Sequence, residues 1–256
     1  MVTMIPRAVP TVAVCWDVDG TLLLGGPIGT EVLGEAFTQV TGHPPRFEAI
    51  SMGGHTDWLI GEALRDALDA EAAAEIAARG DAFGHAMIAA VSAEWRRRAG
   101  DLHAVARTLP GVRETVAALA AEPGVVQTLT TGNVRVGAHA KLTAVGLADG
   151  PIDLGLGGYG EGPGARVRVV EQARDALSAH FGAAPPLVVV GDTPRDVEAA
   201  HRAGAVAVGV ATGRCGVGEL RDAGAEHVFD DLADPGRLVA VVRSTGEDRH
   251  AAEAGR

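Results

Sequence analysis

Short runs of apolar residues recur along the chain, and most are followed by a turn and then by a helical pattern. Strands that are apolar throughout are typical of a parallel sheet whose two faces are both covered by helices. Five such runs predict strands, at residues 11–16, 125–130, 186–192, 205–212 and 227–232. The pattern therefore predicts an α/β fold with a Rossmann-like parallel sheet at its core.

The region from about residue 27 to residue 107 breaks this alternation. Here no strand pattern is found, and apolar residues recur every three or four positions, as on one face of a helix. Glycine and proline mark both edges of the region, at 25–27 and 109–111. We therefore expect an all-helical cap at 27–106, inserted into a core made of 1–26 and 107–256.

Composition and charge narrow the class of protein. The 256 residues carry a formal net charge of −11, which argues against a nucleic-acid or anionic-membrane partner, since such proteins show a basic face. No apolar stretch approaches the roughly 18 residues of a membrane span. If the substrate is an anion, positive charge must come locally, from a metal, a few basic side chains or helix N-termini.

The two cysteines suggest a protein of the reducing cytoplasm. Cys15 falls in a predicted buried strand and Cys215 in a loop, so we expect no disulfide framework. The first ten residues lack the apolar core of a signal peptide and are interpreted as a short disordered lead-in. From about Ser244 the sequence is polar, and we expect a frayed tail.

Four aspartates follow two of the predicted strands. Asp17 and Asp19 lie at the end of the first strand, Asp192 at the end of the third, and Asp196 just inside the helix that follows. In an open α/β sheet, ligands bind beyond the carboxyl ends of the strands. Converging carboxylates repel one another unless a cation is present, and hard oxygen ligands of this number suit Mg²⁺.

Two simpler explanations exist for the pair Asp17 and Asp19. An EF-hand Ca²⁺ loop fails because Leu23 and Ile28 stand where ligands are needed and no glutamate occupies the twelfth position. Plain turn chemistry at a strand end would not explain the second acidic pair, Asp192 and Asp196. A bound cation accounts for both pairs.

The second predicted strand ends in Thr130, Thr131, Gly132 and Asn133, directly before a helix. A hydroxyl together with free backbone N–H groups at a helix N-terminus forms an anion site. An N-cap made by a threonine side chain would explain the same residues equally well. Both interpretations stay open at the level of sequence.

Taken in order, DVDGT at 17–21, TTGN at 130–133 and GDTPRD at 191–196 resemble the motifs of the haloacid dehalogenase-like (HAD) hydrolase superfamily. The likeness covers nearly the whole chain, because the helical insertion after the first motif is similar to the family's C1 cap. It is closest to the phosphoglycolate-phosphatase-like members.

The resemblance implies a role for each motif. Asp17 would be the nucleophile that forms an aspartyl-phosphate, and Asp19 the general acid and base. Thr131 would hold a phosphoryl oxygen, with Gly132 and Asn133 also contacting substrate. Mg²⁺ would be held by Asp17, Asp192 and Asp196 together with the Asp19 carbonyl.

One motif departs from the family pattern. Members usually carry a Lys-Pro pair after the third core strand, where this chain has GGYGEGPGARVRVV without lysine. Arg166 or Arg168 must serve instead, and arginine is a competent phosphate partner because it stays charged and can contact two oxygens. We favour Arg166, at the start of the predicted helix, over Arg168; either could instead be a solvated side chain.

Several weaker patterns were given simpler interpretations. G-x-G-x-x-G at 155–160 is interpreted as a flexible glycine-rich loop rather than a dinucleotide site, because no acidic residue ends a following strand. His55, in the expected cap, either contacts substrate or lies beside a helix cap made by Thr56 or Asp57. The arginines at 96–98 are expected to be a solvated helix end, with an anionic substrate tail as the alternative.

These observations favour a Mg²⁺-dependent phosphatase that acts on a small phosphorylated metabolite. A phosphomutase acting on a sugar phosphate, a 2-haloacid dehalogenase and an inactive phosphate-binding module are the alternatives. The dehalogenase is disfavoured because enzymes of that kind in the superfamily need no acid two residues after the nucleophile, where this chain has Asp19. Neither the substrate nor the oligomeric state can be derived from the sequence.

Overall fold

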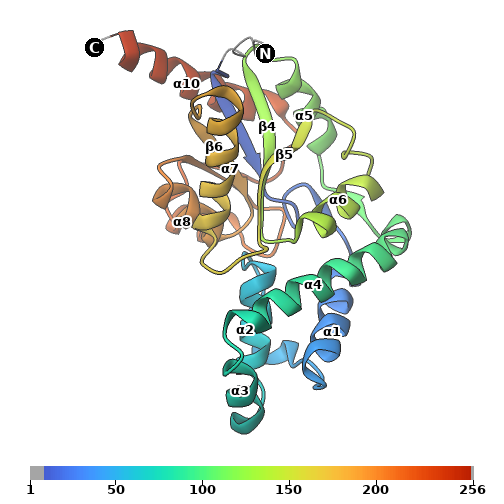
Figure 1. Cartoon of the computed structure of the whole chain (residues 1–256). Helices are drawn as coiled ribbons and strands as arrows, with labels where there is room; N and C mark the ends of the chain where they lie inside the picture. Colours follow the sequence, from blue (N-terminus) through green and yellow to red (C-terminus); the bar gives the residue numbers. More distant parts are fainter. Residues whose placement is uncertain (1–8, 255–256) are drawn as a thin grey trace, which may run out of the picture.

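The computed structural model describes residues 9–254, with side chains through Glu247. Its core is a sheet of six parallel strands in the order β5-β4-β1-β6-β7-β8 (Figure 1). The strands are β1 (Val12–Trp16), β4 (Val125–Thr131), β5 (Ile152–Tyr159), β6 (Leu187–Gly191), β7 (Val206–Val210) and β8 (His227–Phe229). Each strand expected from an apolar run is confirmed, and so is the α/β fold.

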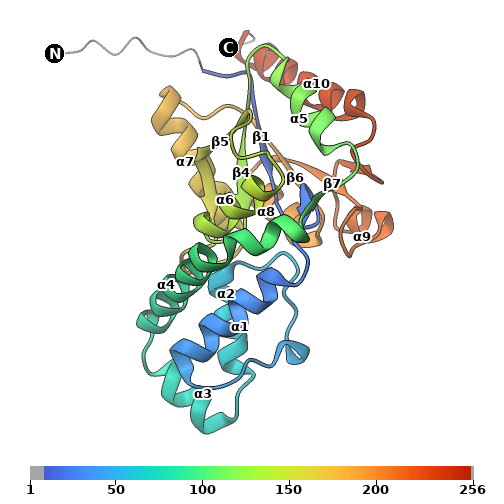
Figure 2. The ribbon, with the colours of Figure 1, turned by 90° about the vertical axis from the view of Figure 1, so that its right-hand side faces the viewer.

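Alternating residues of the central strand explain why both faces of the sheet are covered. Val12, Val14 and Trp16 of β1 belong to one hydrophobic cluster, which includes residues of α5 (Val112–Ala120), α6 (Arg135–Ala144) and α10 (Pro235–Ala254). Ala13 and Cys15 face the other cluster, with α7 (Val167–Phe181), α8 (Pro194–Arg202) and α9 (Val217–Asp222). Figure 2 shows α5 and α10 on one side of the sheet and α7 on the other.

Two expectations about the core were wrong. The glycine-rich segment at 155–160 is not a flexible loop, because residues through Tyr159 form strand β5, which pairs with β4. Its glycines allow close packing: a Cβ on Gly158 would collide with the Val169 carbonyl. The segment after Ser244 was expected to fray, but helix α10 continues to Ala254. The expected lead-in lies largely outside the described residues.

Helices occupy the chain between two very short strands, β2 (Leu23–Leu24) and β3 (Arg107–Thr108), which pair antiparallel where the chain leaves and re-enters the core. They are α1 (Ile28–Thr41), η1 (Phe47–Ala49), α2 (Asp57–Asp66), α3 (Ala70–Ala77), α4 (Asp81–Arg98) and η2 (Ala99–Ala104). Most of them contribute to one apolar cluster, which also includes Val134 and Ala140 beside and within α6. Figure 1 shows α1–α4 below the sheet. The boundaries at 27 and 106 stay a prediction.

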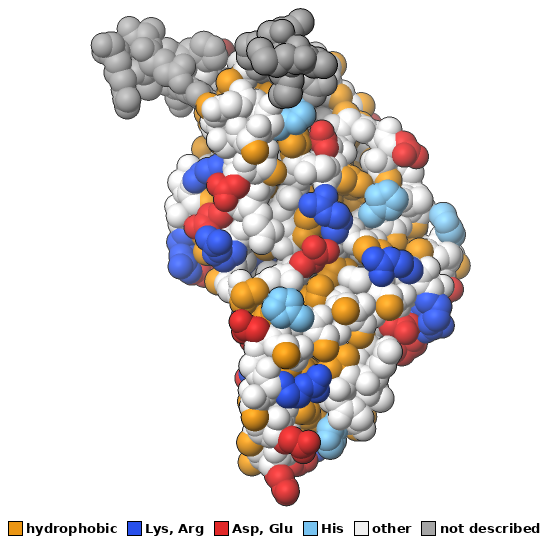
Figure 3. Space-filling model, viewed as in Figure 1, with side chains coloured by type: hydrophobic (Ala, Val, Ile, Leu, Met, Phe, Trp, Pro, Cys, Tyr) orange, Lys and Arg blue, Asp and Glu red, His pale blue; other side chains and the backbone are white. Residues whose placement is uncertain are grey.

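The surface and the two cysteines add little chemistry of their own. Within residues 9–254, no helix is long and apolar enough to cross a membrane. Basic side chains are interspersed with Asp and Glu on the face seen in Figure 3. Cys15 is buried and Cys215 partly buried, and both are free thiols.

Candidate active site

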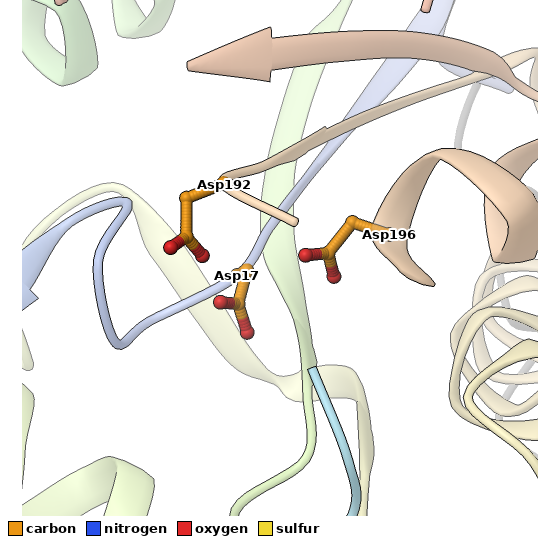
Figure 4. Close-up of side chains that lie close together, drawn as sticks. All are labelled: Asp17, Asp192 and Asp196. Atoms are coloured by element: carbon orange, nitrogen blue, oxygen red, sulfur yellow. The ribbon is translucent and has the colours of Figure 1, made fainter. Parts of the chain in front are cut away.

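Three buried carboxylates meet at the carboxyl ends of neighbouring strands. Asp17 directly follows β1, Asp192 directly follows β6, and Asp196 lies in the first turn of α8. Their oxygens come within 4.8 Å of one another, and Figure 4 shows the three side chains turned toward a common point. The topology causes this, because β1 and β6 are hydrogen-bonded neighbours in the sheet.

Local backbone features hold two of these carboxylates in place. Asp196 Oδ2 accepts hydrogen bonds from the Thr193 N–H at 3.1 Å and the Thr193 hydroxyl at 2.6 Å, which forms the cap of α8. Asp192 packs against Gly20 and Gly213, where a Cβ on either glycine would collide with its carboxylate. Glycine is required at position 20 for a second reason, its φ of 85°.

Arg166 is the buried counter-charge of this cluster. It is the N-cap residue of α7 and is 7% exposed. Its Nη2 donates to Asp17 Oδ1, lies 2.7 Å from Asp196 Oδ1 and donates to the Thr130 carbonyl at 3.1 Å. Arg168, the alternative from the sequence, is exposed and pairs with Glu171. The structure therefore places Arg166, and not Arg168, beside the expected nucleophile.

One guanidinium does not neutralise three buried carboxylates. Burial raises the pKa of Asp17 to about 6, with Arg166 opposing and Asp196 and Asp19 adding to the rise. Burial, followed by the charges of Asp17 and Asp196, raises the pKa of Asp192 to about 8. For Arg166, burial lowers the pKa, but the neighbouring carboxylates outweigh it and hold the pKa above its usual range.

These residues fit a divalent cation. The carboxylates are oxygen donors, as Mg²⁺ prefers, and the raised pKa of Asp192 shows that its charge is poorly compensated. The Asp19 carboxylate is not among the three that meet, so a contribution from Asp19 would come through its main-chain carbonyl, as the sequence suggested. The number and type of donors support the expected metal.

Asp19 belongs to a second group of polar residues. Its Oδ2 accepts from Lys141 Nζ at 2.5 Å and from Asn133 Nδ2 at 2.8 Å. The Asn133 amide also donates to Thr131 Oγ1 at 2.7 Å and accepts from Lys141 at 2.6 Å. Thr131, Asn133 and Asp19, three residues expected in the site from sequence, are thus connected to one lysine.

The sequence analysis missed Lys141. It lies in the last turn of α6, 4% exposed, and is the only lysine among 22 basic residues of the chain. The family pattern places its lysine in the segment after the third core strand, where this chain has Arg166 instead. A unique lysine on the helix that follows TTGN was the available signal.

The start of α2 and the loop before it dock onto the ends of the core strands. The Asp57 N–H donates to the Gly132 carbonyl at 2.7 Å, and the Trp58 N–H donates to the Gly160 carbonyl at 3.2 Å. A Cβ on Gly132 would collide with the His55 carbonyl, so this approach requires glycine. Arg195, in the GDTPRD motif, donates to the Gly53 carbonyl at 2.6 Å. The helical region is therefore closed against the core.

Carboxylates of the chain itself occupy the N-terminus of α6. Asp57 Oδ2 accepts from the Val134 N–H at 2.7 Å, and Glu161 Oε1 accepts from the Arg135 N–H at 2.6 Å. Burial raises the pKa of Asp57 to about 6, against the hydrogen bond from Val134. The N–H groups of Val134 and Arg135 already have acceptors within the chain, so they are not free to bind an anion. Thr131 and Gly132 could contribute to an anion site only from the end of β4.

His55 lines a cavity of about 150 Å³ between the docked loop and helices α7 and α8, together with Arg166 and Arg195. Its Nδ1 lies 2.6 Å from the Ser51 carbonyl. Burial lowers the pKa of His55, partly opposed by that hydrogen bond. The neighbouring Thr56 caps α2 by accepting from the Leu59 N–H, so the helix-cap part of the sequence interpretation is confirmed.

Two of the three arginines at the end of α4 form ion pairs within the helical region. Arg98 pairs with Glu31, Glu35 and Asp101 at 2.6–3.0 Å, and Arg97 pairs with Glu35 and Glu94. Surface pairs of this kind stabilise weakly, by about 0–1 kcal/mol each. The two arginines thus already have partners.

Comparisons with known proteins agree with this geometry. The family model for haloacid dehalogenase-like hydrolases matches residues 11–204. A predicted phosphoglycolate phosphatase from Haemophilus somnus 129PT is similar in structure, with a TM-score of 0.58, 20% identity, and coverage of 89% of this chain and 97% of that one. No curated protein matches the chain.

Two further solved structures share the fold. One is a hydrolase from Pseudomonas syringae, with a TM-score of 0.61, 21% identity, and coverage of 90% of this chain and 99% of that one. The other is assigned by name as a β-phosphoglucomutase, from Bacteroides vulgatus, with a TM-score of 0.60, 20% identity, and coverage of 93% and 91%. At these identities the likeness concerns the fold.

Proposed function

We propose that this chain, which belongs to the haloacid dehalogenase-like hydrolase family, is a Mg²⁺-dependent phosphatase of small phosphomonoesters. The observation that carries the proposal is the setting of Asp17. Its carboxylate ends the central strand, contacts buried Arg166 and faces Asp192 and Asp196, with Asp19 two residues away. Such a site combines a carboxylate nucleophile, fixed positive charge and an acid.

In the first step, Asp17 attacks the phosphorus of the ester. An Asp17 oxygen–phosphorus bond forms, the bond from phosphorus to the ester oxygen breaks, and Asp19 gives its proton to the departing alkoxide. Arg166 already binds Asp17 Oδ1, which leaves Oδ2 for the attack and puts the guanidinium beside the transferring group. Fixed charge at this point lowers the barrier because negative charge builds up on the phosphoryl oxygens.

In the second step, water hydrolyses the aspartyl-phosphate. Asp19 takes a proton from the water, the water oxygen bonds to phosphorus, and Asp17 leaves as a carboxylate, so inorganic phosphate is released. Thr131, whose hydroxyl sits 2.7 Å from Asn133 Nδ2, would orient a phosphoryl oxygen in both steps. Asp19 ends each cycle protonated, ready for the next ester.

Bound Mg²⁺ would supply charge that offsets the phosphate and the acidic cluster. Asp17, Asp192, Asp196 and the Asp19 carbonyl would hold it, in line with the family pattern. A cation of charge +2 suits a site in which burial raises the pKa of both Asp17 and Asp192.

The docked loop supports a small substrate. Gly132, Gly160 and the GDTPRD motif are each covered by residues 53–58, so a macromolecule would have to displace this loop to reach Asp17. A closed cap also keeps bulk water from the aspartyl-phosphate. His55 and the cavity beside Arg166 lie where they could contact a substrate of limited size.

The test is Mg²⁺-dependent release of phosphate from 4-nitrophenyl phosphate. Wild type, Asp17→Asn and wild type with EDTA are assayed together, and both controls are expected to lose activity by about 10³-fold or more, because the nucleophile or the metal is gone. Mg²⁺ binding by Asp17→Asn, measured by calorimetry, shows whether the variant keeps its metal site.

Other results separate the alternatives. Phosphate transfer to a second hydroxyl of a hexose phosphate, without free phosphate, would identify a phosphomutase. Halide release from a 2-haloacid would identify a dehalogenase. A wild type that binds Mg²⁺ but turns over no phosphomonoester would be an inactive phosphate-binding module, and the proposal would be abandoned.

A further inference from the structure

We propose that Lys141 is a positioning residue for Asp19, holding one carboxylate oxygen so that the other faces the substrate. The inference rests on the proposed function, in which Asp19 is the acid and base. Its basis is a buried charge that the reaction described above does not use. Lys141 is 4% exposed, and its Nζ lies 2.5 Å from Asp19 Oδ2.

The two oxygens of Asp19 have different surroundings. Oδ2 accepts from both Lys141 and Asn133, whereas Oδ1 makes no hydrogen bond to any described residue. The Asp19 side chain is 47% exposed, whereas the Lys141 side chain is 5% exposed. The pair therefore has a fixed, buried end and a free end that reaches solvent, which is the end able to exchange a proton with a leaving group.

The surroundings of Lys141 leave its ammonium few other orientations. Asn133 Oδ1 accepts a second hydrogen bond at 2.6 Å, and the ring of Trp95, from α4, lies 5.3 Å from Nζ. A Cβ on Gly29, at the start of α1, would lie 3.7 Å from Nζ. The charge of Lys141 also acts on Asp57. Burial raises the pKa of Asp57, and the positive charge of Lys141 partly opposes that rise.

Asn133 extends the effect of Lys141 to a second functional residue. Asn133 Oδ1 accepts from Lys141, and the Asn133 Nδ2 group donates to Asp19 and Thr131. Since a shift of about 1 Å in a reacting group can cost on the order of 10²-fold in rate, a lysine that fixes this arrangement matters without touching substrate.

The experiment uses a series of para-substituted phenyl phosphates whose phenols range from good to poor leaving groups. An acid in the right place matters most for poor leaving groups. Lys141→Met keeps the length of the side chain and removes the charge. We expect it to reduce kcat for the poorest leaving group by about 10–100-fold and for 4-nitrophenyl phosphate by about 3-fold or less.

A double-mutant cycle shows whether Lys141 acts through Asp19. In an Asp19→Asn background, Lys141→Met is expected to change the leaving-group dependence by about 2-fold or less, because the acid that it orients is gone. His139→Gln, an exposed substitution on the same helix, is the matched control and should leave the leaving-group dependence unchanged. Thermal unfolding of each variant reports whether the fold is kept.

A measurement without turnover follows the pair directly. With lysine labelled at Nζ with ¹⁵N, the chain gives one side-chain ammonium signal, because Lys141 is its only lysine. We expect Asp19→Asn to shift that signal and His139→Gln to leave it in place. An unshifted signal in Asp19→Asn would show that the contact does not exist in solution.

The outcomes separate this inference from the proposed function. If wild type hydrolyses the series and Lys141→Met lowers all members equally, or lowers them equally in both backgrounds, the positioning role is refuted and the phosphatase stands. If wild type hydrolyses none of the series, the proposed function fails, and the inference that depends on it fails too.

Discussion

Two buried basic residues meet the two aspartates of DVDGT, and they differ in what surrounds them. Arg166 contacts Asp17 and Asp196, and its hydrogen-bond and ion-pair partners among the described residues belong to the sheet core. Lys141 contacts Asp19 and Asn133, but Trp95 and Gly29, which border it, belong to the helical region. The side of the site that holds Asp17, the proposed nucleophile, is thus built within the core, and the side that holds Asp19, the proposed acid, is shared with the helical region.

This difference in surroundings indicates which part of the proposed reaction depends on the position of the cap. Opening the cap would leave the contacts of Arg166 to Asp17 and Asp196 in place, since both partners are core residues. The same motion would withdraw Trp95 from Lys141 and expose the pair to water. We therefore expect charge stabilisation to be permanent and the setting of the acid to be completed on closure.

The largest effect should come from Arg166. Arg166→Met leaves Asp17 and Asp196 buried without their counter-charge and removes a fixed charge from the phosphoryl group. We expect kcat/KM for 4-nitrophenyl phosphate to fall by about 10²–10³-fold. Arg168→Met, on the exposed face of the same helix, should keep nearly full activity. Equal losses in the two variants would contradict the assignment of Arg166.

An intermediate effect concerns the stability of the metal-free core. The pKa of Asp192 is about 8 in the folded protein, against roughly 3.9 when unfolded. Between these values the folded state binds a proton that the unfolded state lacks, so stability falls as pH rises toward 8 and levels off above it. In EDTA, we expect the wild-type Tm to fall by on the order of 2–4 °C or more between about pH 6 and pH 8.5.

Asp192→Asn is the control for that fall. It removes the ionisation of Asp192, so its Tm should be nearly constant between about pH 7 and pH 8.5, because Asp17 and Asp57, with pKa about 6, complete most of their ionisation below pH 7. Saturating Mg²⁺ should also abolish the fall in the wild type and have no such effect on the variant. A variant that follows the wild-type curve would show that Asp192 is not the group responsible.

The smallest effect compares two cap tryptophans of similar burial. Trp95 lies over Lys141, whereas Trp58 packs against Gly84 and the ring of His85 within the cap. Each Trp→Phe change should cost roughly 1–3 kcal/mol of unfolding free energy. Only Trp95→Phe should make the rate more sensitive to the leaving group, by about 2–5-fold for the poorest member of the series.

Equal effects of the two tryptophan substitutions on the leaving-group dependence would remove the distinction between the two sides of the site. If Trp58→Phe changed the leaving-group dependence as much as Trp95→Phe, the cap would act through its overall stability. Urea unfolding and the phenyl phosphate series, measured on the same preparations, separate these explanations.

Much of the fold followed from local pattern alone. Apolar runs such as VAVCW can be buried on both faces only in a sheet covered by helices, so the strands and the α/β class were readable. Strand β5 was missed because four of its neighbouring positions at 155–160 are glycine, which disfavours strands locally. Its close approach to α7, with Gly158 against the Val169 carbonyl, is a tertiary requirement that overrides propensity.

The same division holds for the site. The sequence by itself determined the acidic motifs, because carboxylates at the ends of neighbouring parallel strands must meet, and it pointed to Arg166 at the start of α7. That position is unfavourable for a cation, since the helix N-terminus is itself positive, and Asp17 and Asp196 compensate for it.

The contacts that surround Asp19 follow from the tertiary structure alone. Lys141 is 122 residues away along the chain, on a helix whose own pattern gives no reason for a buried charge. Asp57 caps α6 from 77 residues before Val134. The Asp57 contact depends on how the helical region closes on the core, and the Lys141 contact depends on how α6 packs beside the end of β1. No periodicity along the chain encodes either arrangement. Motifs determine which groups react, and packing between distant segments determines how they are held.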